Sequence, residues 1–394
     1  AIKKNLRNIL KMKKLINFLI SKKKKLGKKF LPLHEPSIDM SDKKLIIKGI
    51  NSGYVSTAGK DIKKFEDKIK KIVKSKFVIS TINGTSALHI GLKVLGVKHN
   101  DEVLVPTISF IAPANAILYN YAIPHFVDSE LKHFGIDPEK LENYLKRNAI
   151  VKKNKCINKK TRRTIRAIIV VHVFGHPAQI TRIISIAKKY RIKVLEDAAE
   201  ALGSFFNGKH VGTFGDVGIL SFNGNKIVTT GVGGAIISNN KKISQLSKHL
   251  TTTAKKKHKW DFIHDMVGYN YRIANINASL GISQLKRLKS FIKIKKILFL
   301  KYKNLIGESN EFSILDQPIN CQSNFWLQTL IIKNSSRSKK IKVLNIFHKN
   351  KIFARPVWKP LHKIKFLKKY PKMNLANSEI LENKIINLPS SHYL

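Results

Sequence analysis

Two side chains that could do chemistry follow the ends of two predicted strands. The first strand is the apolar run 193–195, which is followed by Asp197. The second is the apolar run 217–222, which is followed by Lys226. Ligands in open α/β sheets bind beyond the carboxyl ends of the strands. We therefore expect one carboxylate and one amine to lie in a common site.

This pair matches what pyridoxal 5′-phosphate (PLP) requires. The amine of Lys226 could form an imine with the aldehyde of the cofactor. The carboxylate of Asp197 could keep the pyridine nitrogen protonated, which makes the ring an electron sink. Ser221 and the glycine-rich run 231–234 flank the lysine and make the combination more specific. The plainer alternatives are a solvated lysine, one of 75 Lys and Arg, and an aspartate that caps a helix.

A candidate phosphate site follows the predicted strand 77–79. Gly84, Thr85 and Ser86 come next and begin a helix predicted over 87–95. Gly84 lets the backbone approach a ligand closely, and the first amides of a helix point at an anion with the helix dipole behind them. Thr85 and Ser86 could add hydroxyl donors. A simple helix cap formed by Thr85 or Ser86 is the alternative.

Three further candidate side chains stand at predicted strand ends. Phe110 follows the strand 102–106 and could stack on a pyridine ring or belong to the core. His172 and His176 follow the strand 167–171 and could contact a substrate or serve as hydrogen-bonded scaffold. Because no cysteine or second acid stands at metal-ligand spacing from them, we expect no metal site.

Strands and helices alternate from residue 77 to residue 197, and this alternation predicts an α/β fold with a mostly parallel, doubly wound sheet. A helix, a loop and a helix are predicted over 38–75. A polar, lysine-rich loop is predicted over 152–166.

The second half of the chain predicts a smaller α+β domain. A long helical region over 273–305 leads to a strand at 325–332 and a helix at 339–349. The expected divisions are a basic N-terminal extension (1–30), a large domain (31–250) and a small C-terminal domain (251–394).

Composition is that of a globular protein. The chain has 394 residues, 43% of them hydrophobic and 8% aromatic, which is enough for two cores. Its two cysteines form no metal or redox motif and suit a reducing compartment, so we expect a cytoplasmic protein. No apolar run approaches the about 20 residues that span a bilayer. The basic amphipathic stretch 1–30 is expected to pack on the body as a helix or to fray, and contact with a membrane surface is a weaker alternative.

The formal charge of +51 allows two explanations. A strongly basic field attracts nucleic acid and other polyanions, so a polyanion-binding protein without catalysis is one reading. Lysines scattered over the whole chain beside abundant Ile and Asn favour compositional drift instead. We expect no specific nucleic-acid partner, because no aromatic-studded basic repeat or zinc motif is present.

The motifs around the candidate pair resemble a known family. Residues 196–203 (EDAAEALG), Gly215-Asp216 and residues 221–226 (SFNGNK) are similar to the DegT/DnrJ/StrS sugar aminotransferases, and the resemblance extends from about Pro32 to Ser391. The resemblance implies a PLP-dependent transferase of fold type I, the aspartate aminotransferase fold. Local strings look most similar to the LegC-type members; these strings are at 32–36, 175–177, 355–358 and 387–391.

The resemblance also implies roles for single residues. Lys226 would carry PLP, Asp197 would pair with its ring nitrogen, and the segment with Gly84 would hold its phosphate. Glu200 would contact the ring or its O3′ hydroxyl, with a solvent-facing or capping glutamate as the alternative. Asn270, alone only a turn residue, would reach the PLP phosphate of a neighbouring subunit, which implies a homodimer with shared sites. His176 and Arg355 are candidate substrate contacts.

The implied reaction is a two-stage transamination. An amino donor, expected to be L-glutamate, would aminate the cofactor, which would then aminate C4 of a UDP-4-keto-6-deoxy-N-acetylhexosamine on the way to legionaminic-type sugars. A GDP-perosamine-type enzyme, a 3-keto-sugar enzyme and a PLP-bound regulator are alternatives on the same fold. Some relatives carry histidine at the lysine position and dehydrate their substrates, and Lys226 argues against that reaction here.

Overall fold

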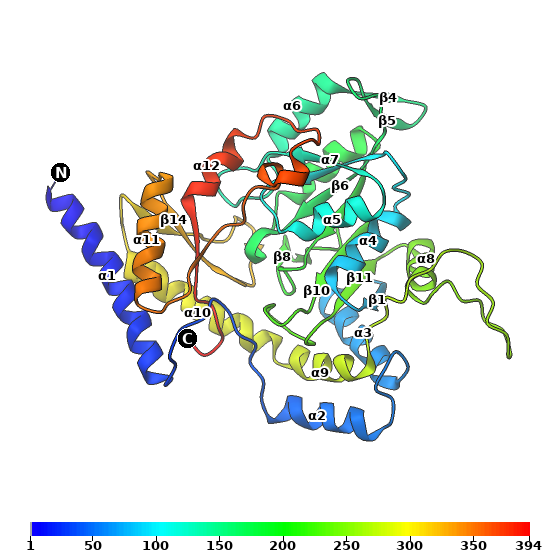
Figure 1. Ribbon diagram of the computed structural model, residues 1–394, viewed down its shortest axis with the longest axis horizontal. Coiled ribbons are helices and arrows are strands. Elements are labelled where there is room, and N and C mark those ends of the chain that lie inside the picture. The colour runs from blue at the N-terminus through cyan, green and yellow to red at the C-terminus, as the bar shows by residue number, and fades with distance from the viewer. Residues whose placement is uncertain (1) are drawn as a thin grey trace.

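A seven-stranded sheet lies at the centre of the larger part of the molecule (Figure 1). The computed structural model describes residues 2–394, with side chains from residue 11 onward. The strand order is β1-β11-β10-β7-β6-β2-β3. Strands β10 to β3 of this order pair in parallel, whereas β11 is antiparallel to both of its neighbours. The predicted mostly parallel sheet is therefore confirmed. Its strands are β1 (Phe77–Thr81), β2 (Glu102–Pro106), β3 (Ile123–Val127), β6 (Ile165–Val171), β7 (Lys193–Asp197), β10 (Val217–Ser221) and β11 (Gly234–Ser238).

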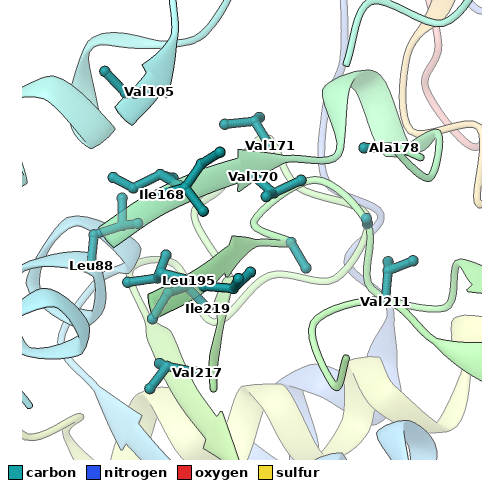
Figure 2. Packing of buried hydrophobic residues seen from close by; sticks show 14 of the residues in the cluster. Leu88, Val105, Ile168, Val170, Val171, Ala178, Leu195, Val211, Val217 and Ile219 are labelled. Carbon is teal, nitrogen blue, oxygen red and sulfur yellow. The ribbon is translucent and has the colours of Figure 1, made fainter. Parts of the chain in front are cut away.

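Helices connect these strands and cover the sheet, so the central strands are apolar on both faces. Figure 2 shows Ile168 and Val170 of β6 beside Leu195 of β7 and Ile219 of β10, all of them almost completely buried. The helices of this part are α2 (Met40–Asn51), α3 (Lys60–Val73), α4 (Gly84–Val94), α5 (Ile111–Tyr119), α6 (Pro138–Asn148), α7 (Ile180–Lys189) and α8 (Lys241–Thr251), with the short 3-10 helix η1 (Val173–Gly175).

The prediction of a loop over 152–166 is wrong, because part of it is a β-hairpin. Strands β4 (Ala149–Lys152) and β5 (Lys155–Asn158) pair antiparallel around Lys153 and Asn154. These two residues have φ angles of 46° and 59°, as a tight two-residue hairpin turn requires. Asn158 at the end of β5 is buried and donates a 2.8 Å hydrogen bond to Glu102 Oε2. The many lysines of this stretch hide the strand pattern.

The predicted long helical region over 273–305 is two helices. α9 (Asn275–Lys286) packs against α2 and α3, and α10 (Leu288–Ile306) continues toward the second sheet. Arg287 stands at the break between them and pairs with Asp39, at 2.8 Å, and with Asp42. These ion pairs fix the helix junction to the beginning of α2.

A second, antiparallel sheet forms the core of the smaller part, in the order β12-β14-β16-β15. A small three-stranded sheet, β13-β8-β9, joins the two parts because β13 pairs with β8. The elements are β12 (Phe312–Ile314), β13 (Cys321–Gln322), β14 (Gln328–Ile332), β15 (Arg355–Pro356), β16 (Ile385–Leu388), β8 (Phe205–Phe206), β9 (Lys209–His210), α11 (Arg337–Lys349), α12 (Ala376–Lys384), η2 (Leu361–Lys363) and η3 (Lys365–Leu367).

The N-terminal helix α1 (Ile2–Lys25) packs along α10 at the edge of this smaller part (Figure 1). Leu15 and Leu19 are fully buried in one hydrophobic cluster with Tyr302 of α10. Because the apolar side of α1 belongs to that cluster, we propose that α1 is a structural part of the small domain. No helix in the described part of the chain is both long and apolar enough to cross a membrane.

Candidate active site

A cavity of about 350 Å³ lies beyond the carboxyl ends of β6, β7 and β10. These strands are neighbours in the sheet, so Val171, Asp197 and Ser221 at their ends meet at one edge. Four segments and three single residues line the cavity; they are 83–88, 109–113, 197–200 and 221–226, with Val171, Trp326 and Trp358. The structure thus brings Asp197 and Lys226 into the same cavity.

Asp197 places a carboxylate in an environment with little water. It is 6% exposed, and its Oδ1 accepts a 3.0 Å hydrogen bond from the amide of Ala199. Burial raises the pKa of Asp197, although the Ala199 amide and the positive charge of Lys226 act in the opposite direction. Such a carboxylate is stabilised by a cationic donor placed in the cavity. A protonated pyridine nitrogen is a donor of this kind, so Asp197 fits bound PLP.

Lys226 presents its amine to the same cavity. Its side chain is 14% exposed, and its Nζ lies 3.3 Å from Glu200 Oε1. Glu200 is itself buried, and its Oε2 accepts a 2.9 Å hydrogen bond from the amide of Phe174. Burial is also the main cause that raises the pKa of Glu200. Glu200 therefore neither faces solvent nor caps a helix, and it orients the lysine amine.

The N-terminus of α4 forms one wall of the cavity. Asn83 caps the helix, because its Oδ1 accepts a 2.7 Å hydrogen bond from the amide of Ser86. The predicted cap by Thr85 or Ser86 is wrong, and the amide of Ser86 is used by the cap. Gly84 and Thr85 line the cavity, where a Cβ on Gly84 would come within 3.0 Å of the Ser221 Cβ. Because Gly84 has no side chain, a phosphate group can approach its backbone closely.

Phe110 lies at the cavity mouth and is not a core residue. It precedes α5, lines the cavity and is 55% exposed. An aromatic face in that position can stack on a flat heterocycle. The core alternative for Phe110 is therefore wrong.

Five candidate residues from the sequence do not line this cavity; they are Ser86, His172, His176, Asn270 and Arg355. His176 is 1% exposed and shares a 2.8 Å hydrogen bond with the hydroxyl of Ser323, so the structure does not support its prediction as a substrate contact. Arg355 is exposed on β15 and is not among the residues that line the cavity. Asn270 is exposed on the segment after α8, where it bridges to Thr252, and it lies outside the cavity of its own chain.

His172 and Glu196 form a buried scaffold behind Asp197. His172 Nε2 lies 3.0 Å from Glu196 Oε2, and His172 Nδ1 accepts a 3.1 Å hydrogen bond from an amide. Glu196 also accepts hydrogen bonds from the amides of Gly212, Phe214 and Gly215. Burial raises the pKa of Glu196, but the hydrogen bonds from His172 and from the amides of Gly212 and Gly215 outweigh it and hold the pKa below its usual value. The pair fixes the loop that leads into β10.

Several lining residues were not predicted as site residues from the sequence, among them two asparagines and two tryptophans. Asn223 and Asn225 add amides beside Lys226, and Trp326 and Trp358 come from the smaller part of the chain. The tryptophans are two of only three in the sequence, which is the signal that could have drawn attention to them. Among the described residues, no three His, Cys, Asp or Glu side chains are grouped so as to hold a metal ion.

Known proteins resemble this chain over nearly its full length. The family model described as the DegT/DnrJ/EryC1/StrS aminotransferase family matches residues 36–394. The GDP-perosamine synthase of Escherichia coli O157:H7 is 34% identical over 363 residues, which cover 92% of this chain and 93% of that protein. EpsN of Bacillus subtilis (strain 168), a putative pyridoxal phosphate-dependent aminotransferase, is 35% identical over 84% of this chain and 82% of its own.

A solved structure has a similar fold. PseC of Helicobacter pylori, an aminotransferase involved in the biosynthesis of pseudoaminic acid, matches with a TM-score of 0.83 at 25% identity. The match covers 92% of this chain and 94% of that one.

The buried Glu196 leads to a pH-dependent prediction. We expect Glu196→Gln to lower the free energy of unfolding by about 2–4 kcal/mol near neutral pH, because His172 and three amides lose a charged acceptor. The lowered pKa means that this stabilisation is present above the ordinary value of 4.5 and is lost as the pH falls through the lower folded value.

Urea unfolding of both proteins at about pH 7 and about pH 3.5 measures this difference. Glu142→Gln is the matched control, because Glu142 is 41% exposed and its loss should change stability little. A difference between Glu196→Gln and the unmodified protein that stays constant over this pH range would contradict the role given to Glu196.

Proposed function

We propose that this chain, which belongs to the DegT/DnrJ/EryC1/StrS aminotransferase family, transfers an amino group to C4 of a nucleotide-linked 4-keto-6-deoxy sugar. Members of this family are PLP-dependent aminotransferases of fold type I, as the sequence motifs predicted. The observation that carries the proposal is the joint position of Asp197 and Lys226 in one cavity at the carboxyl ends of parallel strands.

The lining residues suggest how PLP is held. Lys226 would bind its aldehyde carbon, and Asp197 would accept a hydrogen bond from its ring nitrogen. Gly84 and Thr85 would receive its phosphate at the N-terminus of α4, with the hydroxyl of Ser221 beside them. The exposed ring of Phe110 would cover one face of the pyridine.

The side chains of the cavity can carry out the proton movements of a transamination. PLP, when bound, withdraws electrons from the substrate carbon next to the nitrogen. Lys226 Nζ would take a proton from the substrate and return it on the cofactor side, as general base and then general acid. Glu200, 3.3 Å from Nζ, would keep the amine pointed into the cavity between these steps. Asp197 would keep the ring nitrogen protonated throughout.

Two acceptors remain in competition within the proposed reaction. The strings typical of LegC-type members favour a UDP-linked N-acetylhexosamine. The 34% identity to a GDP-perosamine synthase favours a GDP-linked sugar instead. We propose the UDP-linked sugar, with L-glutamate as the amino donor, in the synthesis of surface polysaccharide or legionaminic-type sugars. Two free, buried cysteines are compatible with a reducing compartment, and we propose a cytoplasmic location.

We also propose that two copies of the chain share their active sites. The segment after α8 projects from the body (Figure 1). Its large apolar side chains are exposed. Trp260 is 69% exposed, Phe262 78% and Val267 75%, and Asn270 follows them. Large apolar side chains that are exposed this close together in the sequence are typical of an interface. Asn270 would then reach the PLP phosphate of the partner, which explains why it lies outside its own cavity.

Replacement of the lysine tests the cofactor assignment. We expect Lys226→Ala to bind no covalently attached PLP, because its side chain carries the amine of the cavity, and to lose at least about 1,000-fold in transamination rate. The absorbance of bound PLP and the site of borohydride reduction, found by peptide mass spectrometry, are the measurements. Lys296→Ala is the control, since this lysine is exposed. A reducible PLP bond that persists in Lys226→Ala would show that another lysine holds the cofactor.

The acceptor is tested by direct competition. We expect glutamate-dependent amination of a UDP-linked 4-keto-6-deoxy-N-acetylhexosamine to exceed that of a GDP-linked 4-keto-6-deoxy sugar by at least about tenfold in kcat/KM. NMR of the product identifies the aminated carbon. A preference for the GDP sugar would replace the proposal with a perosamine-type enzyme, and amination at C3 would replace it with a 3-keto-sugar enzyme.

Shared sites predict that two inactive variants restore each other. In a 1:1 mixture of Lys226→Ala and Asn270→Ala that is allowed to exchange subunits, about a quarter of the sites regain both residues. We expect activity to rise to about that fraction. A mixture of Lys226→Ala with Asp197→Asn is the matched control, because no exchange can place both residues in one site. Equal, low activity in the two mixtures would mean that Asn270 acts within its own chain or not at all.

A further inference from the structure

An aromatic side chain from the smaller part of the molecule covers the amine of Lys226. The centroid of the Trp326 ring lies 4.0 Å from Lys226 Nζ. Trp326 precedes β14 and is only 3% exposed. Together with Glu200, 3.3 Å away, the indole encloses the amine on two sides. The amine is therefore open only on the side that faces the cavity.

Hydrogen bonds hold both the indole ring and the backbone of Trp326 in place. Its Nε1 donates a 2.7 Å hydrogen bond to the carbonyl of Asn225, the residue directly before Lys226. Its backbone amide donates a 2.9 Å hydrogen bond to Asn324 Oδ1. Asn324 Nδ2 in turn donates to the carbonyls of Glu200, at 2.8 Å, and Leu202, at 2.9 Å. Trp326 is thus hydrogen-bonded directly to the segment that carries Lys226 and, through Asn324, to the segment that carries Glu200.

A buried lysine holds the carbonyl of Trp326. Lys295 of α10 is fully buried, and its Nζ donates to the carbonyl oxygen of Trp326 at 2.9 Å. It also donates to the carbonyl of Ser390 at 2.5 Å and to its hydroxyl at 3.1 Å. An ammonium group has three donors, and all three are used here. Burial lowers the pKa of Lys295 well below its usual value, because the charged form of this side chain is costly away from water.

We propose that Trp326 is a further residue of the transaminase site, which covers the amine of Lys226 and confines it to the cofactor side. We propose Lys295 as the positioning residue that keeps Trp326 in this place from the opposite side of the segment. The proposal rests on Lys226 as the reacting amine. A lysine side chain loses rotamer entropy when it is fixed, and the indole and Glu200 fix it before the reaction. A cation over an indole face adds attraction when little water is present.

Chemical modification of Lys226 tests the cover directly. In the full chain freed of cofactor, acetic anhydride labels accessible amines, and peptide mass spectrometry gives the rate at Lys226 relative to the exposed Lys293. We expect Trp326→Leu to raise this relative rate about tenfold, because the ring that excludes reagent and water is gone. Trp326→Phe keeps an aromatic ring and should stay within about threefold of the unmodified chain.

The positioning role is tested with a neighbouring pair of variants. Lys295→Met removes the three hydrogen bonds and keeps the length of the side chain, whereas Lys296→Met changes an exposed neighbour. We expect Lys295→Met to raise labelling of Lys226 and to slow a single turnover with glutamate about tenfold. The amount of bound PLP should stay the same. Lys296→Met should change neither the labelling of Lys226 nor the rate of the single turnover.

Specific outcomes overturn the proposal. Labelling of Lys226 in Trp326→Leu at the rate of the unmodified chain would show that the indole does not cover the amine. If Trp326→Leu does not fold, unchanged labelling in Lys295→Met and a large increase in Trp326→Phe would each contradict the proposal. A PLP bond to a lysine other than Lys226 would instead remove the premise, and that result comes from a separate measurement.

Discussion

The active site depends on carboxylates held where water is scarce. Asp197 and Glu200 are both buried, and burial raises the pKa of each. A buried carboxylate without a positive partner costs several kcal/mol, so the cavity favours cations. Lys226 supplies one positive charge beside Glu200, and the protonated ring nitrogen of bound PLP would supply another beside Asp197. The neighbouring positions of β7 and β10 in the sheet make this arrangement possible.

The site is completed across two parts of the chain. The larger part provides the carboxylates, the lysine and the N-terminus of α4, while Trp326 and Trp358 come from residues far along the sequence. Two contacts join the parts: the side chain of Asn324 donates to the carbonyls of Glu200 and Leu202, and β13 pairs with β8. A change in the position of the small domain would therefore move the cover of the amine together with the wall of the cavity.

Local patterns in the sequence predicted much of the fold and the polar floor of the site. Apolar runs followed by Asp197 and by Lys226 indicate parallel strands whose carboxyl ends meet, and the structure brings these residues together. The same rule placed His176 at a strand end, but its ring turns inward to Ser323, which no local pattern reveals. Trp326 was missed because its position depends on contacts with Asn225 and Asn324, and the first of these is distant in sequence.

The high positive charge and the buried Lys295 have different explanations. Compositional drift adds lysines where they cost little, which is at exposed positions, and 75 Lys and Arg against 24 acids fit that process. Among the side chains described, Lys295 is the only lysine that is fully buried. Drift does not account for a lysine at a position where burial opposes its charge. Its three hydrogen bonds end on Trp326 and Ser390, so the requirement that keeps a lysine there is geometric. The carbonyl of Trp326 thus connects Lys295, in the middle of α10, to the indole ring that covers the amine of Lys226.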